Sequence, residues 1–159
     1  MSEQQPNMPP SNQPMFNVER LYIKDLSFEN PNAPEVYARH NEPTVEFNLG
    51  TGVVQKGEDR YEVTLQMNAR VKEGEEVLFL VEVTYAGLFR IRNVPQEHLA
   101  PTLGIECPHI IFPYVRRVVS DLVTEGGFKP MVLDPINFAA LYHQAKAREA
   151  QGDGGGVAI

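Results

Sequence analysis

The stretch YEVTLQMNARVK, residues 61–72, alternates between apolar and polar side chains without a break. Successive side chains of a β-strand point to opposite faces, so this pattern predicts a strand that is buried on one face and solvated on the other. The predicted inward-facing residues are Tyr61, Val63, Leu65, Met67, Ala69 and Val71. One such strand is not stable alone, because it needs neighbours to pair with and a second layer to cover its apolar face.

Three further segments are predicted to be strands, because they alternate in the same way or are rich in aromatic and β-branched residues. They are FNVERLYIKDLSFE at 16–29, TVEFNLG at 44–50 and VLFLVEVTYAG at 77–87. The connections between the strands carry turn residues, namely NPNAP at 30–34, GED at 57–59 and EGEE at 73–76. Short loops between consecutive strands predict an antiparallel meander of four strands.

After Pro95 the apolar period changes from two to 3.6. Residues 113–127 are predicted to be a helix with apolar residues on one side. These residues are Val115, Val118, Val119, Leu122 and Val123. Asp134 and Pro135 suit the cap and first turn of a last helix over 134–149. Strands followed by helices predict an α+β fold, in which a four-stranded antiparallel sheet has helices packed on one side.

The length of 159 residues suits one domain, which we place at 16–149 between two tails. Residues 1–15 are rich in proline, glutamine and asparagine and are predicted to be disordered, while the glycine-rich residues 150–159 are predicted to be flexible. A formal net charge of −7 argues against nucleic acid as a partner, because phosphate binding needs clustered lysine and arginine. With one cysteine, no signal-peptide pattern and no apolar run of about 20 residues, we expect a cytoplasmic protein without direct membrane insertion.

The only cysteine stands in the motif Cys107–Pro108–His109, which raises the question of a nucleophile and its base. On an extended segment, residues two apart point the same way but lie ~6–7 Å from each other, beyond hydrogen-bond range. The flanking residues Ile105, Ile110, Ile111 and Phe112 are all apolar. An apolar environment raises the pKa of a thiol. The sequence therefore predicts a buried structural thiol and not a nucleophile.

The chain offers no other recognisable site for chemistry. The four histidines, His40, His98, His109 and His143, include no i, i+4 pair, and there is no second cysteine to complete a metal site. Gly50-Thr51-Gly52 is too short for a dinucleotide loop, and no G-x-S-x-G motif occurs. We therefore expect a binding protein without catalytic residues, metal or cofactor. The alternative is a small-ligand-binding or enzymatic α+β domain, which has no reason to prevent an unfolded polypeptide from aggregating.

Several segments resemble the SecB protein-export chaperones of bacteria, in order from about residue 20 to residue 142. They are RLYIKDLSFENPNAP (20–34), YEVTLQMNARV (61–71), FLVEVTYAGLFRI (79–91), LGIECPHIIFPYVRRVVSDLV (103–123), GGF (126–128) and LDPINFAALY (133–142). The resemblance implies an ATP-independent cytosolic holdase that forms a homotetramer, a dimer of dimers. Such a protein binds unfolded secretory precursors and delivers them to the translocase motor SecA. Cys107–Pro108 is then expected to be a corner that turns the chain into the following helix.

Three sets of residues follow from the resemblance and from the strand pattern. The SecA-binding residues are expected to be Asp25, Glu29, Leu80 and Glu82, which pattern alone would interpret as a solvated sheet face. A holdase needs apolar grooves that accept many sequences, and the candidate client-binding residues are Tyr37, Val45, Phe47, Phe79, Leu141 and Tyr142. The expected oligomer interface is Val81, Val83 and Tyr85, a row that equally suits a core backed by a helix.

Two departures from the family pattern bear on these sites. The loop RHNEP, residues 39–43, lacks the tryptophan often found there in relatives and has Asn41 in its place, at the outer edge of the expected groove. The C-terminal tail lacks the acidic run of relatives and keeps only Asp153. In the family this tail reaches the zinc-binding segment of SecA. We therefore expect the tail contact to contribute less here and the sheet face to contribute more.

Overall fold

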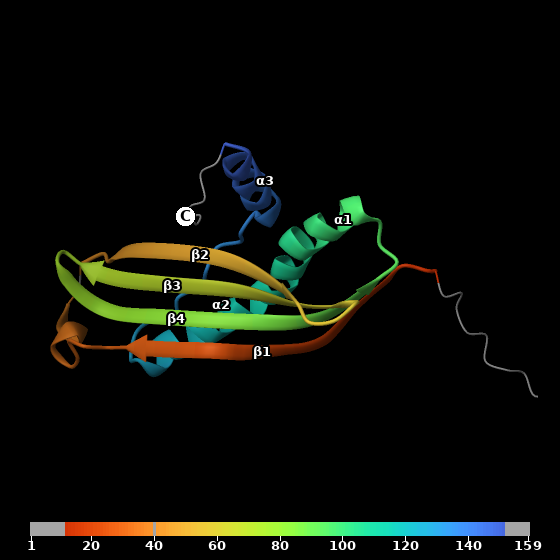
Figure 1. The fold of residues 1–159 in the computed structure, drawn as a ribbon. Coiled ribbons are helices and arrows are strands. Elements are labelled where there is room, and N and C mark those ends of the chain that lie inside the picture. Colours follow the sequence, from red (N-terminus) through yellow and green to blue (C-terminus); the bar gives the residue numbers. More distant parts are fainter. Residues whose placement is uncertain (1–11, 40, 152–159) are drawn as a thin grey trace, which may run out of the picture.

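The computed structural model describes residues 12–39 and 41–151, and it consists of one β-sheet with helices on one of its faces (Figure 1). The elements are β1 (Met15–Glu29), a 3-10 helix (Glu35–Ala38), β2 (Thr44–Gln55), β3 (Arg60–Glu73), β4 (Glu76–Arg92), α1 (Gln96–Pro101), a π-helical turn (Thr102–Glu106), α2 (Cys107–Glu125) and α3 (Phe138–Ala150). The strands are antiparallel in the order β1-β4-β3-β2. The predicted four-stranded sheet with helices on one side is confirmed. Most of the two predicted tails lies outside the described residues.

β1 lies at the edge of the sheet next to β4, and not next to β2 as a meander of four strands requires. The segment 30–43, which joins β1 to β2, therefore crosses the end of the sheet (Figure 1). Neighbouring strands are ~4.8 Å apart, so this crossing covers about 15 Å, too far for a hairpin turn. The predicted meander is right for β2, β3 and β4 and wrong for β1, because the turn residues at 30–34 begin a crossover.

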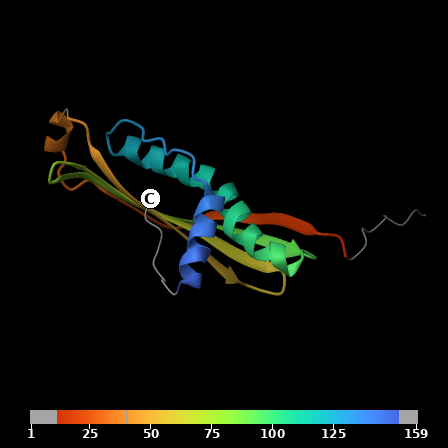
Figure 2. The same ribbon diagram turned by 90° about the horizontal axis from the view of Figure 1, so that it is seen from above.

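The core lies between the sheet and α2, which packs against β3 and β4 (Figure 2). All six predicted inward-facing residues of β3 are buried. On α2 the most deeply buried residues beyond its first turn are Ile111, Val115, Val119 and Val123. Their spacing of four places them on one side of the helix, the side that rests on the two central strands.

β1 keeps its apolar residues on the helix side although they do not alternate regularly. These residues are Phe16, Val18, Leu21, Ile23, Leu26 and Phe28. Their spacing requires one extra residue after position 18 and another after position 23, and the pairing of β1 with β4 skips Glu19 and Lys24 at these points. A β-bulge inserts one residue and so resets which side chains face the core. The two bulges therefore keep these six apolar residues of β1 on the covered side of the sheet.

The helical part of the chain begins just after Pro95, as the change of period predicts, but the helix predicted over 113–127 begins earlier, at Cys107. The π-helical turn leads directly into α2, so Cys107 and Pro108 lie in the first turn of this helix, and the expected corner before the helix is wrong. Pro108 has no N–H group to bond within the helix, and it directly follows the π-helical turn, where the N–H of Cys107 bonds to the carbonyl oxygen of Thr102. A second proline, Pro113, lies inside α2. The apolar period after Pro113 predicted the helix. The start of the helix was not predicted, because it lies in the segment that contains the two prolines.

The last helix begins later than predicted, at Phe138 instead of residue 134. The side chain of Asn137 accepts a hydrogen bond from the backbone N–H of Ala140 at 3.0 Å and so caps the helix. Asparagine and aspartate are both favourable N-caps, and the segment contains one of each, at 137 and 134. In the structure, Asn137 is the N-cap of the helix.

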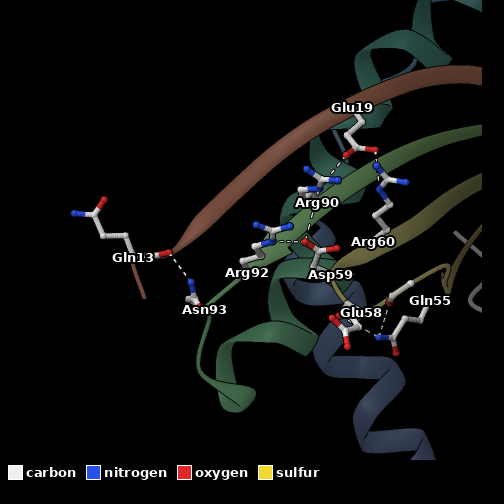
Figure 3. Close-up of polar contacts among 10 residues, drawn as sticks. Gln13, Glu19, Gln55, Glu58, Asp59, Arg60, Arg90, Arg92 and Asn93 are labelled. Atoms are coloured by element: carbon white, nitrogen blue, oxygen red, sulfur yellow. Dashed lines mark hydrogen bonds and ion pairs between the residues drawn. The ribbon is translucent and has the colours of Figure 1, made fainter. Parts of the chain in front are cut away.

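Ion pairs join three strands at the end of the sheet where β4 leaves it (Figure 3). Glu19, in the first bulge of β1, lies 3.4 Å from Arg60 on β3 and 3.1 Å from Arg90 on β4. Asp59, in the turn before β3, pairs with Arg90 at 3.7 Å and also with Arg92. The cluster links the ends of the three strands, and each of these partly exposed pairs contributes little to the free energy of unfolding.

A second polar cluster lies on the face of the sheet that no helix covers. Glu62 on β3 is buried, accepts a hydrogen bond from the hydroxyl group of Tyr22 and pairs with Lys24 at 3.0 Å. Both partners belong to β1 and reach across β4, where Ala86 is small and buried. The hydrogen bond from Tyr22 and the charge of Lys24 lower the pKa of the Glu62 carboxyl group, while burial and the neighbouring Glu62 raise the pKa of Tyr22 to about 12.

We predict that Glu62→Gln destabilises the fold by about 1.5–3 kcal/mol at pH 7, the usual range for a hydrogen bond to a charged group. The pKa of Glu62 is lower in the folded protein than its ordinary value of 4.5. Its contribution is therefore present above pH 4.5 and is lost as the pH falls through the folded pKa. Urea unfolding at fixed protein concentration measures the free energy of unfolding. The difference in this free energy between the variant and the wild type should become smaller in acid.

The control is Glu46→Gln, because Glu46 lies on the same face in an exposed pair with Lys72 at 2.8 Å. Exposed pairs contribute little, so this variant should resemble the wild type at every pH. An effect of Glu62→Gln that stays equally large in acid would contradict the proposed role of the carboxylate charge.

Candidate functional site

An apolar depression lies between the crossover segment 30–43, the edge strand β2 and the segment that follows α2. We call it the groove, and its volume is about 630 Å³. Its apolar lining includes Val36, Tyr37, Val45, Leu78, Phe79 and Phe128. A side pocket of about 320 Å³ lies next to it along β2 and shares Val45 and Met131 with it. The two depressions together form one apolar surface on the helix side of the sheet.

The tip of the crossover segment is held against the end of α2. The hydroxyl group of Tyr37 donates a hydrogen bond to the carbonyl oxygen of Gly126 at 2.8 Å, and the amide of Asn30 donates to the same oxygen at 3.1 Å. The ring of Tyr37 also packs on Phe128, with centroids 5.4 Å apart. Gly127 has a φ of +86°, and a Cβ atom there would lie 3.0 Å from the Tyr37 ring. Glycine is therefore required at this close approach.

The outer edge of the groove is polar. Arg39 forms an ion pair with Glu76, at the start of β4. Asn41 donates a hydrogen bond from its amide group to Oε1 of Glu73 at 2.9 Å. These contacts attach the second half of the crossover segment to the β3–β4 hairpin. Two polar contacts therefore form this edge of the groove.

The structure brings together four of the six expected client-binding residues. Tyr37, Val45 and Phe79 line the groove, and Phe47 lines the side pocket. The other two, Leu141 and Tyr142, are not among the lining residues of either depression. They belong to α3, which packs against the π-helical turn, and a Cβ atom at Gly104 would lie 2.5 Å from the Tyr142 ring. The sequence predicted the apolar stripe of α3, but it did not indicate which elements this stripe packs against.

The sequence pattern missed the segment after α2, which forms one wall of the groove and of the side pocket. Its lining residues include Lys129, Met131, Leu133 and Ile136. Val132, which lines the side pocket, is 72% exposed. The segment has neither a period of two nor one of 3.6, and Pro130 and Pro135 interrupt it. The sequence gives only one indication of this extended, exposed wall. It is a set of apolar residues that lies between two prolines and follows no period.

The expected oligomer-interface residues lie in the core of the single chain. Val81, Val83 and Tyr85 are all buried on the face that α2 covers, and Val83 is only 1% exposed. Tyr85 stacks on Tyr114, an exposed residue of α2, with ring centroids 5.8 Å apart. Of the two interpretations of this row, the geometry matches the core backed by a helix.

The expected SecA-binding residues meet on the helix-free face. In the pairing of β1 with β4, Glu29 lies opposite Leu80 and Ser27 lies opposite Glu82, while Asp25 lies two residues further along, opposite Thr84. The three carboxylates are exposed. Within the described part of the chain, no ion pair involves any of them, whereas Glu46 and Glu62 on the same face are both paired with lysine. We call Asp25, Glu29, Leu80 and Glu82 the acidic patch.

Cys107 is completely buried in the first turn of α2. Burial, with a smaller contribution from the charge of Glu106, raises the pKa of its thiol to about 12. His109 is exposed, and residues two apart on a helix do not face each other. The predicted structural thiol is confirmed, although the extended geometry expected for it is wrong.

A search for metal sites among residues 12–39 and 41–151 finds no group of three His, Cys, Asp or Glu side chains that could hold an ion. His40 lies outside the described residues. In the same two ranges, no helix is long and apolar enough to cross a membrane.

Comparison with known proteins identifies several relatives. The family model described as preprotein translocase subunit SecB matches residues 9–149. The chain is 56% identical to the protein-export protein SecB of Magnetococcus marinus over 142 residues, which are 89% of this chain and 90% of the relative. It is 48% identical to that of Dechloromonas aromatica over 143 residues, 90% of this chain and 94% of the relative.

Among solved structures, the chain is similar in fold to a SecB-like chaperone of Mycobacterium tuberculosis in complex with a ChAD peptide from an antitoxin. The TM-score is 0.64 and the sequence identity is 15%. The likeness covers 76% of this chain and 90% of the other.

Proposed function

Because the chain belongs to the SecB family of protein-export chaperones, we propose that it binds unfolded secretory precursors in the groove without ATP and delivers them to SecA in the cytoplasm. The observation that carries this proposal is the open apolar groove next to an edge strand, on the face opposite a patch of unpaired carboxylates. Both features suit a protein that binds other proteins. They favour the chaperone interpretation over a small-ligand-binding or enzymatic domain.

The groove suits an unfolded client because its lining is largely apolar and comes from several segments, namely the crossover segment, the strands β2, β3 and β4, and the segment after α2. Unfolded chains share exposed apolar side chains and little else, so a site for many of them must use apolar contact area. Tyr37 and Phe128 supply aromatic surface, and Met131 supplies a side chain that adapts to different shapes. We keep Leu141 and Tyr142 as a proposed extension of the client path along α3.

The acidic patch suits a basic surface of SecA. Asp25, Glu29 and Glu82 carry negative charge, and none of them forms an ion pair with another described residue. Such a patch attracts a basic partner and speeds encounter, and symmetric assembly would repeat it on each subunit. Leu80 adds apolar area at the centre of the contact.

We propose a homotetramer, a dimer of dimers, whose first contact involves β1. α2 packs on β3 and β4, so the helix side of β1 is left open, and Phe16, Val18, Ile23 and Leu26 are exposed there. β1 is also an edge strand with unpaired backbone groups. A second copy on this row would cover both the apolar side chains and the edge. Val81, Val83 and Tyr85 would then act on assembly only by positioning α2.

For the client site, we predict that Val45→Asp weakens the binding of a reduced, unfolded precursor by at least about tenfold, because a carboxylate in an apolar contact loses its hydration. Fluorescence anisotropy titration without ATP measures this affinity, and suppression of precursor aggregation provides a second readout.

Val53→Asp is the matched control for the client site. Val45 and Val53 both lie on β2 and are 48% and 45% exposed, but only Val45 lines the groove. Equal affinities of the two variants would argue against the groove as the client site. Tyr142→Glu should weaken binding only if the client path continues along α3.

For the SecA contact, we predict that Asp25→Lys and Glu82→Lys each weaken SecA binding sharply and that the double variant weakens it by more than about tenfold. Client binding and the tetramer should persist, because both residues are exposed on the helix-free face. Calorimetry of the purified pair measures the affinity. Added salt should weaken the wild-type complex, since the screening length is only ~8 Å at physiological ionic strength.

Glu46→Lys on the same face makes the same change in charge outside the acidic patch and serves as the control. Removing residues 151–159 should reduce SecA binding less than either patch variant. Full affinity of the double charge reversal would show that SecA does not use this face.

For assembly, we predict that Ile23→Lys gives a smaller particle that remains folded, because Ile23 is exposed in the single chain. Val83→Asp should instead lower the unfolding temperature, since an unpaired buried carboxylate costs several kcal/mol. Light scattering gives the mass and circular dichroism gives the unfolding temperature. A tetramer that survives Ile23→Lys would place the subunit contact elsewhere than on β1.

A further inference from the structure

Lys24 is the cation nearest in the sequence to the acidic patch, since it directly precedes Asp25. It is the extra residue of the second bulge of β1, because the pairing with β4 skips it between Ile23 and Asp25. Side chains of a regular strand alternate between the two faces, but the bulge interrupts this alternation, so Lys24 and Asp25 both lie on the helix-free face. Their Cα atoms are about 3.8 Å apart, so a lysine side chain is long enough to reach the neighbouring carboxylate.

In the structure the side chain of Lys24 turns away from the acidic patch. It crosses β4, and its Nζ atom lies 3.0 Å from Oε1 of Glu62 on β3. Among the ion pairs between described residues, none joins Lys24 to Asp25. The Glu62 side chain is only 9% exposed, whereas that of Lys24 is 43% exposed. A buried carboxylate thus holds an exposed lysine away from the patch.

Glu62 is itself held at both of its oxygen atoms. Oε2 accepts the hydrogen bond from the hydroxyl group of Tyr22, and Oε1 accepts the one from Lys24. A buried carboxylate that is satisfied at both oxygens keeps one orientation, and so does the lysine bound to it. Lys72 on the same face is likewise paired outside the acidic patch, with Glu46 at 2.8 Å. Both pairs leave the carboxylates of the patch available to a partner.

We propose that Glu62 is a positioning residue for SecA binding: it binds Lys24 and so prevents this cation from neutralising Asp25. This inference rests on the proposed SecA contact at the acidic patch. Without the charge of Glu62, the ammonium group of Lys24 loses its partner, and the adjacent carboxylate is that of Asp25. An ion pair between these neighbours removes one of the three negative charges that attract a basic surface.

The first test is Glu62→Gln, although Glu62 lies outside the acidic patch. This variant should bind SecA about fivefold more weakly, the upper range for one exposed charge pair. Calorimetry with purified SecA measures the affinity, at a temperature at which circular dichroism shows that the variant is folded. A crystal structure of the variant should show Nζ of Lys24 within hydrogen-bond distance of the Asp25 carboxylate. An ammonium group that stays beside residue 62 overturns the inference.

The second test is rescue by Lys24→Met in the Glu62→Gln background. Methionine keeps an unbranched side chain but has no charge, so Asp25 should regain its full negative charge and SecA binding should return to the wild-type value. Removal of the lysine would not reverse a loss of affinity that came only from lower stability.

Lys56→Met in the same background is the matched control for the rescue. Lys56 is exposed, and its charge contributes to the lowered pKa of Glu62. Both double variants have the net charge of the wild type, so a general effect of charge predicts that both restore the affinity. Under the proposed role only Lys24→Met restores it. Rescue by both substitutions, or by neither, contradicts the role of Glu62.

Tyr22→Phe separates this role from the stability of the cluster. It removes a hydrogen bond to Glu62 but leaves the charges of Glu62 and Lys24 in place. This variant should unfold at a lower urea concentration and still bind SecA with wild-type affinity. A loss of affinity as large as that of Glu62→Gln would show that any loosening of the cluster suffices, and would reject the inference.

Failure of the proposed SecA contact has a different signature. In that case Asp25→Lys and Glu82→Lys leave the affinity for SecA unchanged, which rejects the acidic patch and the role of Glu62 with it. If these two variants weaken binding while Glu62→Gln does not, only the inference is overturned. Weaker binding in all three, with rescue by Lys24→Met and not by Lys56→Met, supports both.

Discussion

The packing of α2 on β3 and β4 is the interaction on which the rest of the structure depends. An α-helix with its side chains is about 10–12 Å wide, and neighbouring strands are ~4.8 Å apart, so one helix covers about two strands. The sheet has four strands. The covered face therefore keeps an open flank on each side of α2, over β1 and over β2. This partial cover creates the surfaces that the proposed chaperone function requires.

The two flanks differ because different segments border them. Over β2, the crossover segment and the segment after α2 add apolar walls and form the groove. Over β1 no such segment follows, and the two bulges keep a row of apolar side chains pointing to the open side. The first flank is hollow and suits an extended client, while the second is a flat row with a free strand edge and suits a second copy of the chain.

The parts of this architecture that follow a period could be predicted from the sequence. β3 alternates strictly, and its inward-facing residues are all buried. The start of α2 was missed because Pro108 and Pro113 conceal the period, and the wall of the groove was missed because it has none. Local pattern also cannot distinguish Glu46 from Glu82. Both are outward-facing glutamates on strands, but Glu46 lies opposite Arg70 and pairs with Lys72, whereas Glu82 lies opposite Asn68 and Ser27 and has no ion pair with another described residue.

The two proposed binding surfaces lie on opposite faces of the sheet and meet in β4. Phe79 lines the groove, and the next residue, Leu80, belongs to the acidic patch. Neighbouring residues of a strand point to opposite faces, so each surface depends on the same stretch of backbone. The two proposed surfaces therefore do not overlap, as simultaneous binding of a client and SecA would require. Phe79 and Leu80 are adjacent in β4, so the position of one cannot be set independently of the other.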